Sequence, residues 1–295
     1  MRPSHLLVPL FALGALGVAR AQTAPPSTDI FLVGLTGRGP TLALRDSPRN
    51  VTERPGYDNQ PSWALDGRSF YYTSVRDDGQ ADIYRYDLVS GSVRRVTNTA
   101  PESEYSATVT PDGRALSVIR VERDSTQRLW RFPLDGGAPS LILPGLKPAG
   151  YHAWADERTL VLFVLGSPNA LVIADAAGQH ADTVARNVGR SLHRIPGTTH
   201  VSFVRKVTDD EWWIEELDSS ARTMTRRARL PRGVEDYAWT PSGVLLCGDG
   251  SRLLRWSGNA WESLGDLASS GVTTITRLAV SPGEEWVAVV AVRSN

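Results

Sequence analysis

The sequence predicts an all-β fold, a six-bladed β-propeller made of four-stranded antiparallel blades. Three observations predict it: a repeat of about 45 residues, four short strand-like segments in each repeat, and a tight turn at the same place in each copy. A four-stranded sheet on its own leaves both faces exposed to water, so such repeats must stack around a common axis. A β-sandwich is the alternative, but a sandwich requires no fixed period.

The two clearest copies define the repeat. They carry the turns Asp66-Gly67 and Asp112-Gly113, each followed by a β-rich run and then by a strand with alternating residue types, at 82–86 and 128–132. Asp-Gly supplies the backbone angles that a tight hairpin needs. Alternation along a strand points successive side chains toward opposite neighbours. Each copy is therefore expected to fold as one blade.

Looser copies of the repeat follow. They open at Trp154, near Leu192 and at Tyr237, which gives five blades between residues 56 and 267. The regular spacing of these copies extends the predicted propeller over most of the chain.

The two ends of the chain together predict the sixth blade. Its first two strands are expected within 274–294 and its last two within 29–52, with the fourth strand at either 42–45 or 50–52. A composite blade of this kind closes the ring without a covalent link and leaves no exposed sheet edge.

The N-terminus predicts a cleavable signal peptide. Met1-Arg2 provides a positive start, residues 6–18 form an apolar run, and Ala19-Arg20-Ala21 is a small-x-small cleavage site. The expected organisation is a signal peptide at 1–21 cleaved after Ala21, a flexible leader at 22–28, and one propeller domain at 29–295.

Export implies a protein of the periplasm or the extracellular space, which we expect to be a monomer. The alternative is that residues 6–18 stay uncleaved as an N-terminal anchor. No other run in the sequence approaches the ~18 apolar residues of a transmembrane helix.

Charge and cysteine content exclude further classes of protein. The 32 Lys and Arg residues equal the 32 Asp and Glu residues, which argues against a nucleic acid partner because phosphate binding needs an excess of basic residues. The single cysteine, Cys247, cannot form an internal disulfide. It lies in the apolar run 244–247, so we expect a buried side chain without a nucleophilic role.

A recurring motif combines an aromatic or aliphatic residue, a Pro-Asp-Gly-Arg type of turn, and an Asp-Ile-Tyr strand. It occurs at 62–68 with Asp82-Ile83-Tyr84 and at 110–114, with looser copies at 239–243 and 280–283. This pattern resembles the repeats of the TolB-like β-propeller family over nearly all of the chain after the signal peptide. The resemblance implies a six-bladed propeller in the bacterial periplasm or outside the cell, with one face that binds another protein or a ligand.

The family resemblance is incomplete at the N-terminus. TolB itself carries a smaller α/β domain ahead of its propeller, and only the short leader at 22–28 precedes the first expected strand here. The resemblance therefore supports the architecture and the compartment better than a role in the Tol-Pal system.

Propellers bind ligands mostly at the ends of the central tunnel, which the innermost strand of each blade lines. Aligning the blades three residues upstream of the aromatic or aliphatic position gives Gln60, Ser106, Tyr151, Arg190, Asp236 and Arg277. The copy near Leu192 aligns poorly, so the residue that corresponds to the others could lie one or two places from Arg190. With their neighbours, the expected binding residues are Asp58, Asn59, Glu104, Tyr105, Tyr151, His152, Arg190, Glu235, Asp236 and Arg277.

This mixture of charges with Tyr and His suits a peptide terminus or a small polar ligand. The alternative is a polar channel filled with water. The carboxylates of Asp58, Glu104, Glu235 and Asp236 could also hold Ca²⁺, which prefers oxygen ligands. No other cofactor is expected.

The sequence lacks the common catalytic motifs. It contains no Gly-x-Ser-x-Gly elbow and no His pair at a zinc-site spacing. We therefore expect a non-catalytic propeller that binds a protein, peptide or glycan partner in the bacterial envelope. The alternative is a polysaccharide lyase or hydrolase that uses the acidic cluster with Tyr151 and His152 at the tunnel mouth.

Overall fold

The computed structural model describes residues 26–178 and 180–293, so the expected signal peptide at 1–21 lies outside the described residues. Strands joined by tight turns make up nearly all of the described chain. Its helices are single 3-10 turns, η1 (Gly39–Thr41) and η2 (Ala268–Ser270). The all-β class is therefore confirmed. No helix in the described ranges is long and apolar enough to cross a membrane.

The strands form groups of four, which we call units. Four of these units are separate antiparallel sheets whose strands pair in chain order. Unit 2 contains β7 (Ser103–Val109), β8 (Ala115–Val121), β9 (Gln127–Pro133) and β10 (Ser140–Leu141); unit 3 contains β11 (Ala149–Trp154), β12 (Thr159–Val164), β13 (Ala170–Asp175) and β14 (Ala181–Arg186); unit 4 contains β15 (Val188–Arg194), β16 (Val201–Lys206), β17 (Trp212–Asp218) and β18 (Thr223–Arg229); unit 5 contains β19 (Tyr237–Trp239), β20 (Leu245–Asp249), β21 (Arg252–Trp256) and β22 (Trp261–Asp266).

The remaining strands form one eight-stranded sheet. It consists of unit 1, with β3 (Tyr57–Trp63), β4 (Ser69–Val75), β5 (Ala81–Asp87) and β6 (Val93–Arg95), and of a composite unit with β23 (Ile275–Val280), β24 (Trp286–Val292), β1 (Thr28–Thr36) and β2 (Ala43–Asn50).

A single parallel pair, Thr28 with Tyr57, connects the two halves of this sheet. The sequence predicted two separate antiparallel blades here. The halves are joined because the start of β1 lies against the start of β3, where the Thr28 amide donates to the Gly56 carbonyl at 3.0 Å and its hydroxyl donates to the Asp58 carbonyl at 2.9 Å.

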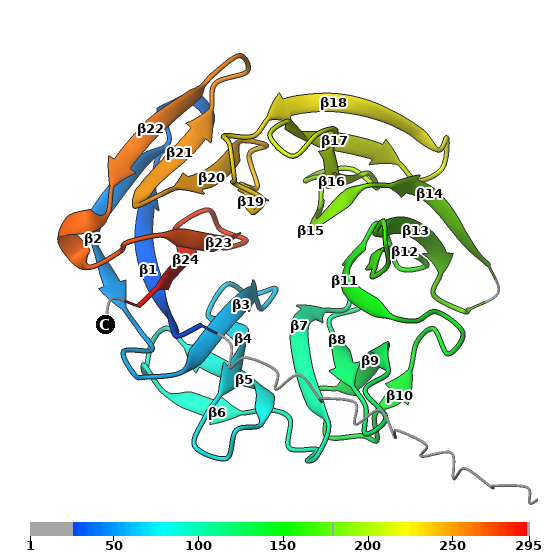
Figure 1. Ribbon diagram of the computed structural model, residues 1–295. Coiled ribbons are helices and arrows are strands. Elements are labelled where there is room, and N and C mark those ends of the chain that lie inside the picture. The colour runs from blue at the N-terminus through cyan, green and yellow to red at the C-terminus, as the bar shows by residue number, and fades with distance from the viewer. Residues whose placement is uncertain (1–25, 179, 294–295) are drawn as a thin grey trace, which may run out of the picture.

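Strands from both chain ends pair in the composite unit, as Figure 1 shows for blue β1 beside red β24. The antiparallel register runs from Thr28 opposite Val292 to Gly34 opposite Trp286. The fourth strand, β2, lies between and overlaps both positions that the sequence offered for it. The pairing of N-terminal and C-terminal strands is therefore present as predicted.

Two outer strands, β14 and β22, were not predicted, and β15 begins at Val188 rather than near Leu192. Both outer strands are largely exposed, so they lack the apolar alternation that marks a buried strand. The start of β15 is obscured by Gly189 and Arg190, which interrupt its apolar residues.

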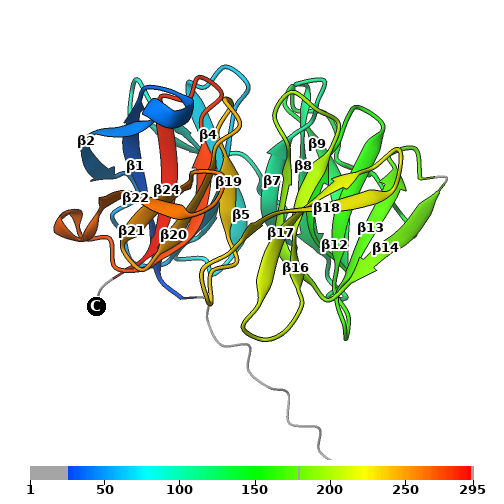
Figure 2. The same cartoon turned by 90° about the horizontal axis from the view of Figure 1, so that it is seen from above.

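Hydrophobic clusters fill the spaces between neighbouring units, which Figures 1 and 2 show standing side by side around a common centre. One cluster packs Tyr71 and Ile83 of unit 1 against Leu116 and Val118 of unit 2. Similar clusters join each next pair of units along the chain, then unit 5 to the composite unit, and the composite unit to unit 1. Each unit thus buries both faces of its sheet.

The alternation of β1 illustrates how one strand serves two clusters. Phe31 and Val33 belong to the cluster shared with unit 5, and Ile30 and Leu32 belong to the cluster shared with unit 1. Successive side chains on a strand point to opposite faces, so the middle of β1, residues 30–33, is apolar and buried on both sides.

Replacing Leu32 with Ala should lower the free energy of unfolding by about 2 to 5 kcal/mol, because the side chain is 1% exposed and its removal leaves a cavity. The matched change Leu134→Ala, at a side chain 40% exposed in a turn, should lower it by less than about 1 kcal/mol. Chemical denaturation followed by tryptophan fluorescence measures both values. Equal losses would contradict a core between the composite unit and unit 1.

Candidate functional site

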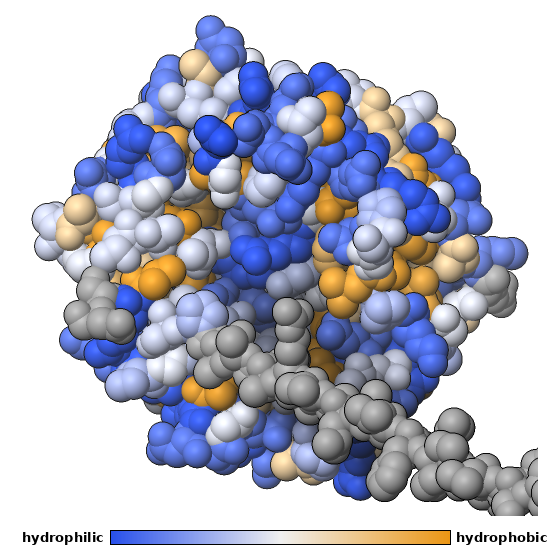
Figure 3. Space-filling model, in the orientation of Figure 1, coloured by the Kyte–Doolittle hydropathy of each residue, from blue (hydrophilic) through white to orange (hydrophobic). Residues whose placement is uncertain are grey.

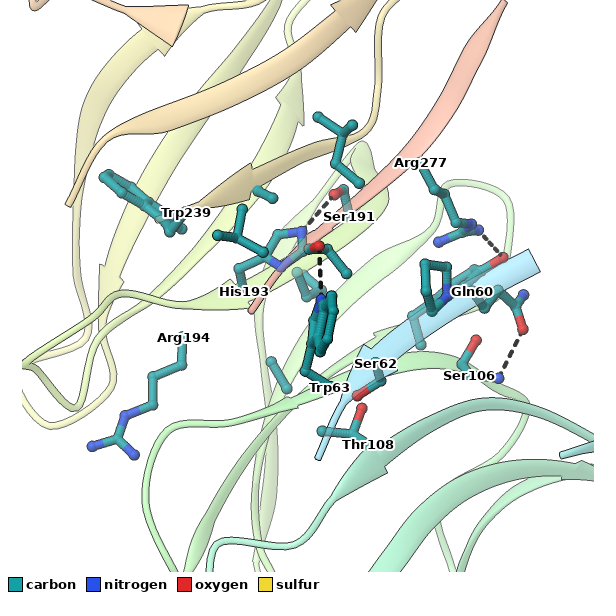
Figure 4. Close-up of a pocket in the computed structure, with 18 of the residues that line it drawn as sticks. Gln60, Ser62, Trp63, Ser106, Thr108, Ser191, His193, Arg194, Trp239 and Arg277 are labelled. Atoms are coloured by element: carbon teal, nitrogen blue, oxygen red, sulfur yellow. Dashed lines mark hydrogen bonds between the residues drawn. The ribbon is translucent and has the colours of Figure 1, made fainter. Parts of the chain in front are cut away.

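A cavity of about 590 Å³ opens at the centre of the ring. It is lined by residues of β3, β7, β11, β15, β19 and β23, the first strand of every unit, and of the turns that follow these strands. Each first strand runs toward these turns, so the cavity has a floor at mid-strand and a mouth at the turns. Figure 4 shows part of its lining.

β-Bulges shape the floor. The register of the first strand shifts between Asn59 and Ser62, between Tyr105 and Thr108, and at corresponding places in β11, β15 and β23. Gln60 and Ser106 adopt left-handed backbone conformations there, with φ of 58° and 53°. A bulge redirects a side chain and is common beside binding sites. The bulges therefore determine which side chains face the cavity.

Gln60 ties unit 1 to unit 2 at the floor. Its Oε1 accepts a hydrogen bond from the Thr73 hydroxyl at 2.8 Å and another from the Ser106 amide at 2.8 Å, the second drawn in Figure 4. The Ser106 hydroxyl is buried and has no hydrogen-bond partner within the described chain.

An ionic group occupies the opposite side of the floor. Arg190 donates to Asp236 at 2.6 Å, and Arg277 approaches the other oxygen of the same carboxylate at 3.5 Å. Arg277 also donates to the Tyr151 hydroxyl at 2.9 Å and stacks over that ring at 5.0 Å. Burial acts to lower the pKa of both guanidinium groups, but the Asp236 carboxylate raises it above the ordinary value, so both stay charged.

Tyr57 begins β3, three residues before Gln60. Burial raises the pKa of its hydroxyl, and the charges of Arg277 and Arg190 oppose that shift. Figure 3 shows hydrophilic residues around the hollowed centre of the ring. The tunnel is thus polar at its middle.

Three tryptophans stand on the walls closer to the mouth: Trp63, Trp154 and Trp239, in units 1, 3 and 5. The corresponding positions in the intervening units hold Val109, Arg194 and Val280. Beyond them the turns place Leu65 and several prolines at the rim, Pro111, Pro196, Pro241 and Pro282. The cavity is therefore a funnel whose mouth is mainly apolar and aromatic, with Arg194 as a charged exception, above a polar floor.

Each indole is fixed by the neighbouring unit. Trp63 donates directly to the Ala279 carbonyl at 2.9 Å. Trp154 donates to the Ser117 hydroxyl at 2.9 Å, and Trp239 donates to the Ser202 hydroxyl at 2.8 Å.

Each of the two serine hydroxyls bridges an indole to a carbonyl of the first strand in the neighbouring unit. Ser117 donates to the Thr108 carbonyl at 3.1 Å, and Ser202 donates to the His193 carbonyl at 3.2 Å. In the composite unit, which neighbours Trp63, the position of these serines is occupied by Ala288. Ala288 pairs with Ala279 and has no hydroxyl. The indole of Trp63 therefore bonds the carbonyl itself.

Two buried histidines complete the lining. His152 Nε2 lies 2.7 Å from the Ser117 hydroxyl, and His193 Nε2 lies 3.1 Å from the Ser191 hydroxyl. Burial lowers the pKa of His152 to about 3 and that of His193 to about 4, so both rings are neutral near pH 7. The other nitrogen of His152 is buried without a partner in the described chain.

Five of the expected binding residues line the cavity: Tyr151, His152, Arg190, Asp236 and Arg277. The alignment was wrong by one place in unit 4. The Ile195 amide bonds the His200 carbonyl as the Thr240 amide bonds the Val244 carbonyl, so Ser191, not Arg190, corresponds to Asp236. Arg190 still reaches the cavity because its side chain is long and a bulge interrupts β15.

The other five expected residues do not line the cavity, because each is bonded or packed elsewhere in the protein. Asp58 is fully buried and accepts from Arg54 at 2.6 Å. Glu104 is fully buried, pairs with Arg120 at 3.2 Å and bonds Thr99. Burial raises the pKa of Glu104 to about 7.

Contacts within the protein also hold the side chains of Asn59, Tyr105 and Glu235. Asn59 accepts from the Gln60 amide at 2.8 Å, and Tyr105 packs against the core shared by units 2 and 3. Glu235 accepts from the Arg190 amide at 2.8 Å and pairs with Lys206 at 3.2 Å. A side chain at Gly189 would collide with this carboxylate, which explains a glycine at that position.

The acidic residues therefore have separate cationic partners. Within 26–178 and 180–293, no three His, Cys, Asp or Glu side chains are close enough together to hold a metal ion. A Ca²⁺ ion at the tunnel mouth stays a prediction from the sequence.

Sequence reasoning missed the three tryptophans and the rim as cavity residues. The signal was present, because the aromatic or aliphatic position used to align the blades is itself the wall of the funnel. Trp212 and Trp213, which the sequence presents as a conspicuous pair, lie in β17 and do not line it.

No protein-family profile matches the chain. A stretch of 129 residues is 29% identical to an uncharacterized protein of Agrobacterium fabrum, and it covers 44% of this chain and 40% of that protein. The match thus spans less than half of the relative's length.

Solved structures show closer agreement in fold. The chain is similar to a candidate TolB from Agrobacterium tumefaciens, with a TM-score of 0.72 and 16% identity over 92% of this chain and 100% of that one. It is similar to TolB from Acinetobacter baumannii, with a TM-score of 0.62 and 11% identity over 92% of this chain and 65% of that one. An oligogalacturonate lyase from Vibrio parahaemolyticus follows, with a TM-score of 0.53 and 11% identity over 92% and 99%. These similarities show a TolB-like β-propeller fold.

Replacing Ser202 with Ala should lower the free energy of unfolding by about 1 to 3 kcal/mol. The hydroxyl is buried and accepts from both Tyr237 and Trp239 at 2.8 Å, so its removal leaves two donors without an acceptor. Chemical denaturation measures the change. The control Ser220→Ala, at an exposed turn, should change the free energy of unfolding by less than about 0.5 kcal/mol. A similar loss of stability in both variants would show that the hydrogen bonds to Ser202 do not stabilise the fold.

Acid should destabilise the protein through His152. Its pKa is about 3 in the folded state and about 6.5 in the unfolded state, so between these values the unfolded chain binds more protons. Its contribution is fully present above pH 6.5 and is lost as the pH falls.

Between pH 7.5 and 5, wild type should therefore lose about 2 kcal/mol more stability than His152→Gln. Gln retains a group that can bond Ser117, and Glu104, whose raised pKa acts in the opposite direction, is common to both proteins. Denaturation curves at a series of pH values provide the comparison. Parallel pH profiles would show that His152 is not buried in its neutral form.

Proposed function

We propose that this chain is an exported, non-catalytic binding module whose central funnel takes an exposed segment of a protein partner in the bacterial envelope. The observation that carries this proposal is the cavity of about 590 Å³, with indole walls above a polar floor. Binding sites are typically concave, mostly apolar, and supplied with a few convergent polar groups.

The proposed architecture is a six-bladed propeller formed by residues 29–295, with each unit as one blade and the composite unit as the sixth. The shared hydrophobic clusters between all neighbouring units support it. The apolar run 6–18 and the cleavage site at Ala19-Arg20-Ala21 support export. We also propose that the mature protein acts as a monomer.

A peptide segment suits the funnel better than a glycan. The faces of sugar rings can stack on indoles, but the hydroxyls of a glycan would lie against the Val, Leu and Pro side chains of the mouth, and burying them unpaired is costly. The mouth offers mainly Trp, Val, Leu and Pro side chains, and polar groups gather at the floor. Apolar side chains of a peptide would contact this mouth favourably.

The alternative, a polysaccharide lyase or hydrolase, has less support. A pKa of about 3 and a hydrogen bond to Ser117 make His152 a poor acid or base at neutral pH. Burial raises the pKa of Cys247, which opposes a nucleophilic role. The alternative retains the Tyr151 hydroxyl, which faces Arg277 in the cavity.

Photo-crosslinking tests partner binding at the funnel. A photoreactive amino acid in place of Leu65, 60% exposed on the rim, should form adducts in envelope extract. Trp239→Ala in the same protein should remove at least about four fifths of the adducts, because the loss of a central aromatic anchor costs more than about 1 kcal/mol of binding.

Two controls accompany this experiment. Trp213→Ala, at a tryptophan outside the cavity, should leave the adducts unchanged. A photoreactive residue in place of Val207, exposed just after β16 at the end of that strand away from the cavity mouth, should not form them. Adducts that survive Trp239→Ala would contradict binding in the funnel. Turnover on a glycan panel that disappears in Tyr151→Phe would favour the enzyme.

A further inference from the structure

The charged lining of the cavity is not balanced. Arg190, Arg194 and Arg277 face it with Asp236 as the one carboxylate among the described lining residues. The two lining histidines are neutral, as described above. Positive charge is therefore in excess inside the funnel, although the whole chain is neutral.

Two guanidinium groups share the Asp236 carboxylate. Their distances to it are 2.6 and 3.5 Å, from Arg190 and Arg277, and the charge of Arg190 acts to lower the pKa of Arg277. The two cations therefore repel each other and are only partly compensated. A second anion between them would relieve this repulsion.

Hydrogen-bond donors are left over at the same place. A guanidinium group has five N–H donors. Arg190 Nε is buried without an acceptor within the described chain, and Arg277 uses one nitrogen for Tyr151 and another for the longer contact with Asp236. Paired guanidinium donors match the two oxygens of a carboxylate.

The surroundings restrict the anion further. The side chains of Arg277 and Asp236 are 15% and 10% exposed, so an anion here loses much of its water. In the same cavity, the walls between the rim and these arginines carry Trp63, Trp154 and Trp239. A carboxylate at the end of an apolar chain matches this order, whereas a free phosphate would leave the aromatic mouth unused.

From these observations we infer that the floor captures the terminal carboxylate of a peptide between Arg277 and Arg190, while the last side chains of the peptide pack against the three indoles. This inference rests on the proposed function and specifies its ligand: a partner segment that ends in the funnel rather than one that passes across it.

The test uses an array of paired peptides, each synthesised once with a free C-terminal carboxylate and once as the C-terminal amide, with apolar residues at the last positions. The mature protein should bind the acids about 10- to 100-fold more tightly than the amides, the range for charge-assisted hydrogen bonds. Arg277→Gln should remove this preference, and Arg232→Gln, at an arginine paired with Asp210 on the surface, should keep it.

A second variant acts in the opposite direction. Asp236→Asn removes the internal carboxylate that competes for both arginines, so it should raise the preference for acids over amides by at least about threefold. Circular dichroism and thermal melting would show whether Arg277→Gln folds. If it folds poorly, the Asp236→Asn variant still tests the inference.

The outcomes separate this inference from the proposed function. Equal binding of acids and amides overturns carboxylate capture and leaves peptide binding in the funnel intact. Binding of uronic acid oligosaccharides in place of any peptide overturns the inference and redirects the site to a glycan. Absence of binding by all probes, together with absence of crosslinks at position 65, overturns the proposed function itself.

Discussion

Burial of both faces of every four-stranded unit is the constraint on which the rest of the structure depends. A sheet such as β11–β14 presents apolar side chains to both sides, and neither side can be left in water. Each face therefore packs against a neighbouring unit, and units that twist and are buried on both faces arrange themselves around a centre. The antiparallel pairing of β1 with β24 extends this arrangement to the chain ends.

The same constraint places the site. The wide spaces between units are filled by apolar clusters, so the first strands meet at the centre without a core of their own. Polar residues collect there: Arg190, Asp236, Arg277 and Tyr151 bond one another, and some guanidinium donors are left without an acceptor in the described chain. Buried polar groups need such partners. The donors that remain unpaired are the ones that a ligand can use.

The repeat and the strand pattern were predictable because Asp-Gly turns and apolar alternation are local signals, as at Asp66-Gly67 and in β5. The joining of unit 1 to the composite unit was not, because it depends on one long-range pair, Thr28 with Tyr57. The position of Arg190 was wrong by one residue because a bulge has no distinct residue type. Asp58 and Glu104 lie two residues before Gln60 and Ser106, ahead of the bulges, and proved to be buried away from the cavity. A bulge interrupts the alternation of faces along a strand, so sequence spacing alone did not place them.

The funnel and the stability of the ring are physically coupled. Trp154 and Trp239 each reach a serine of the preceding unit, and Trp63 reaches its carbonyl because Ala288 provides no hydroxyl. The indole walls are therefore fixed by contacts between units rather than within one. Loosening one interface would change the width of the mouth as well as the free energy of unfolding. A ligand that packs against all three indoles would in turn hold three pairs of units together, so its binding should also stabilise the folded protein.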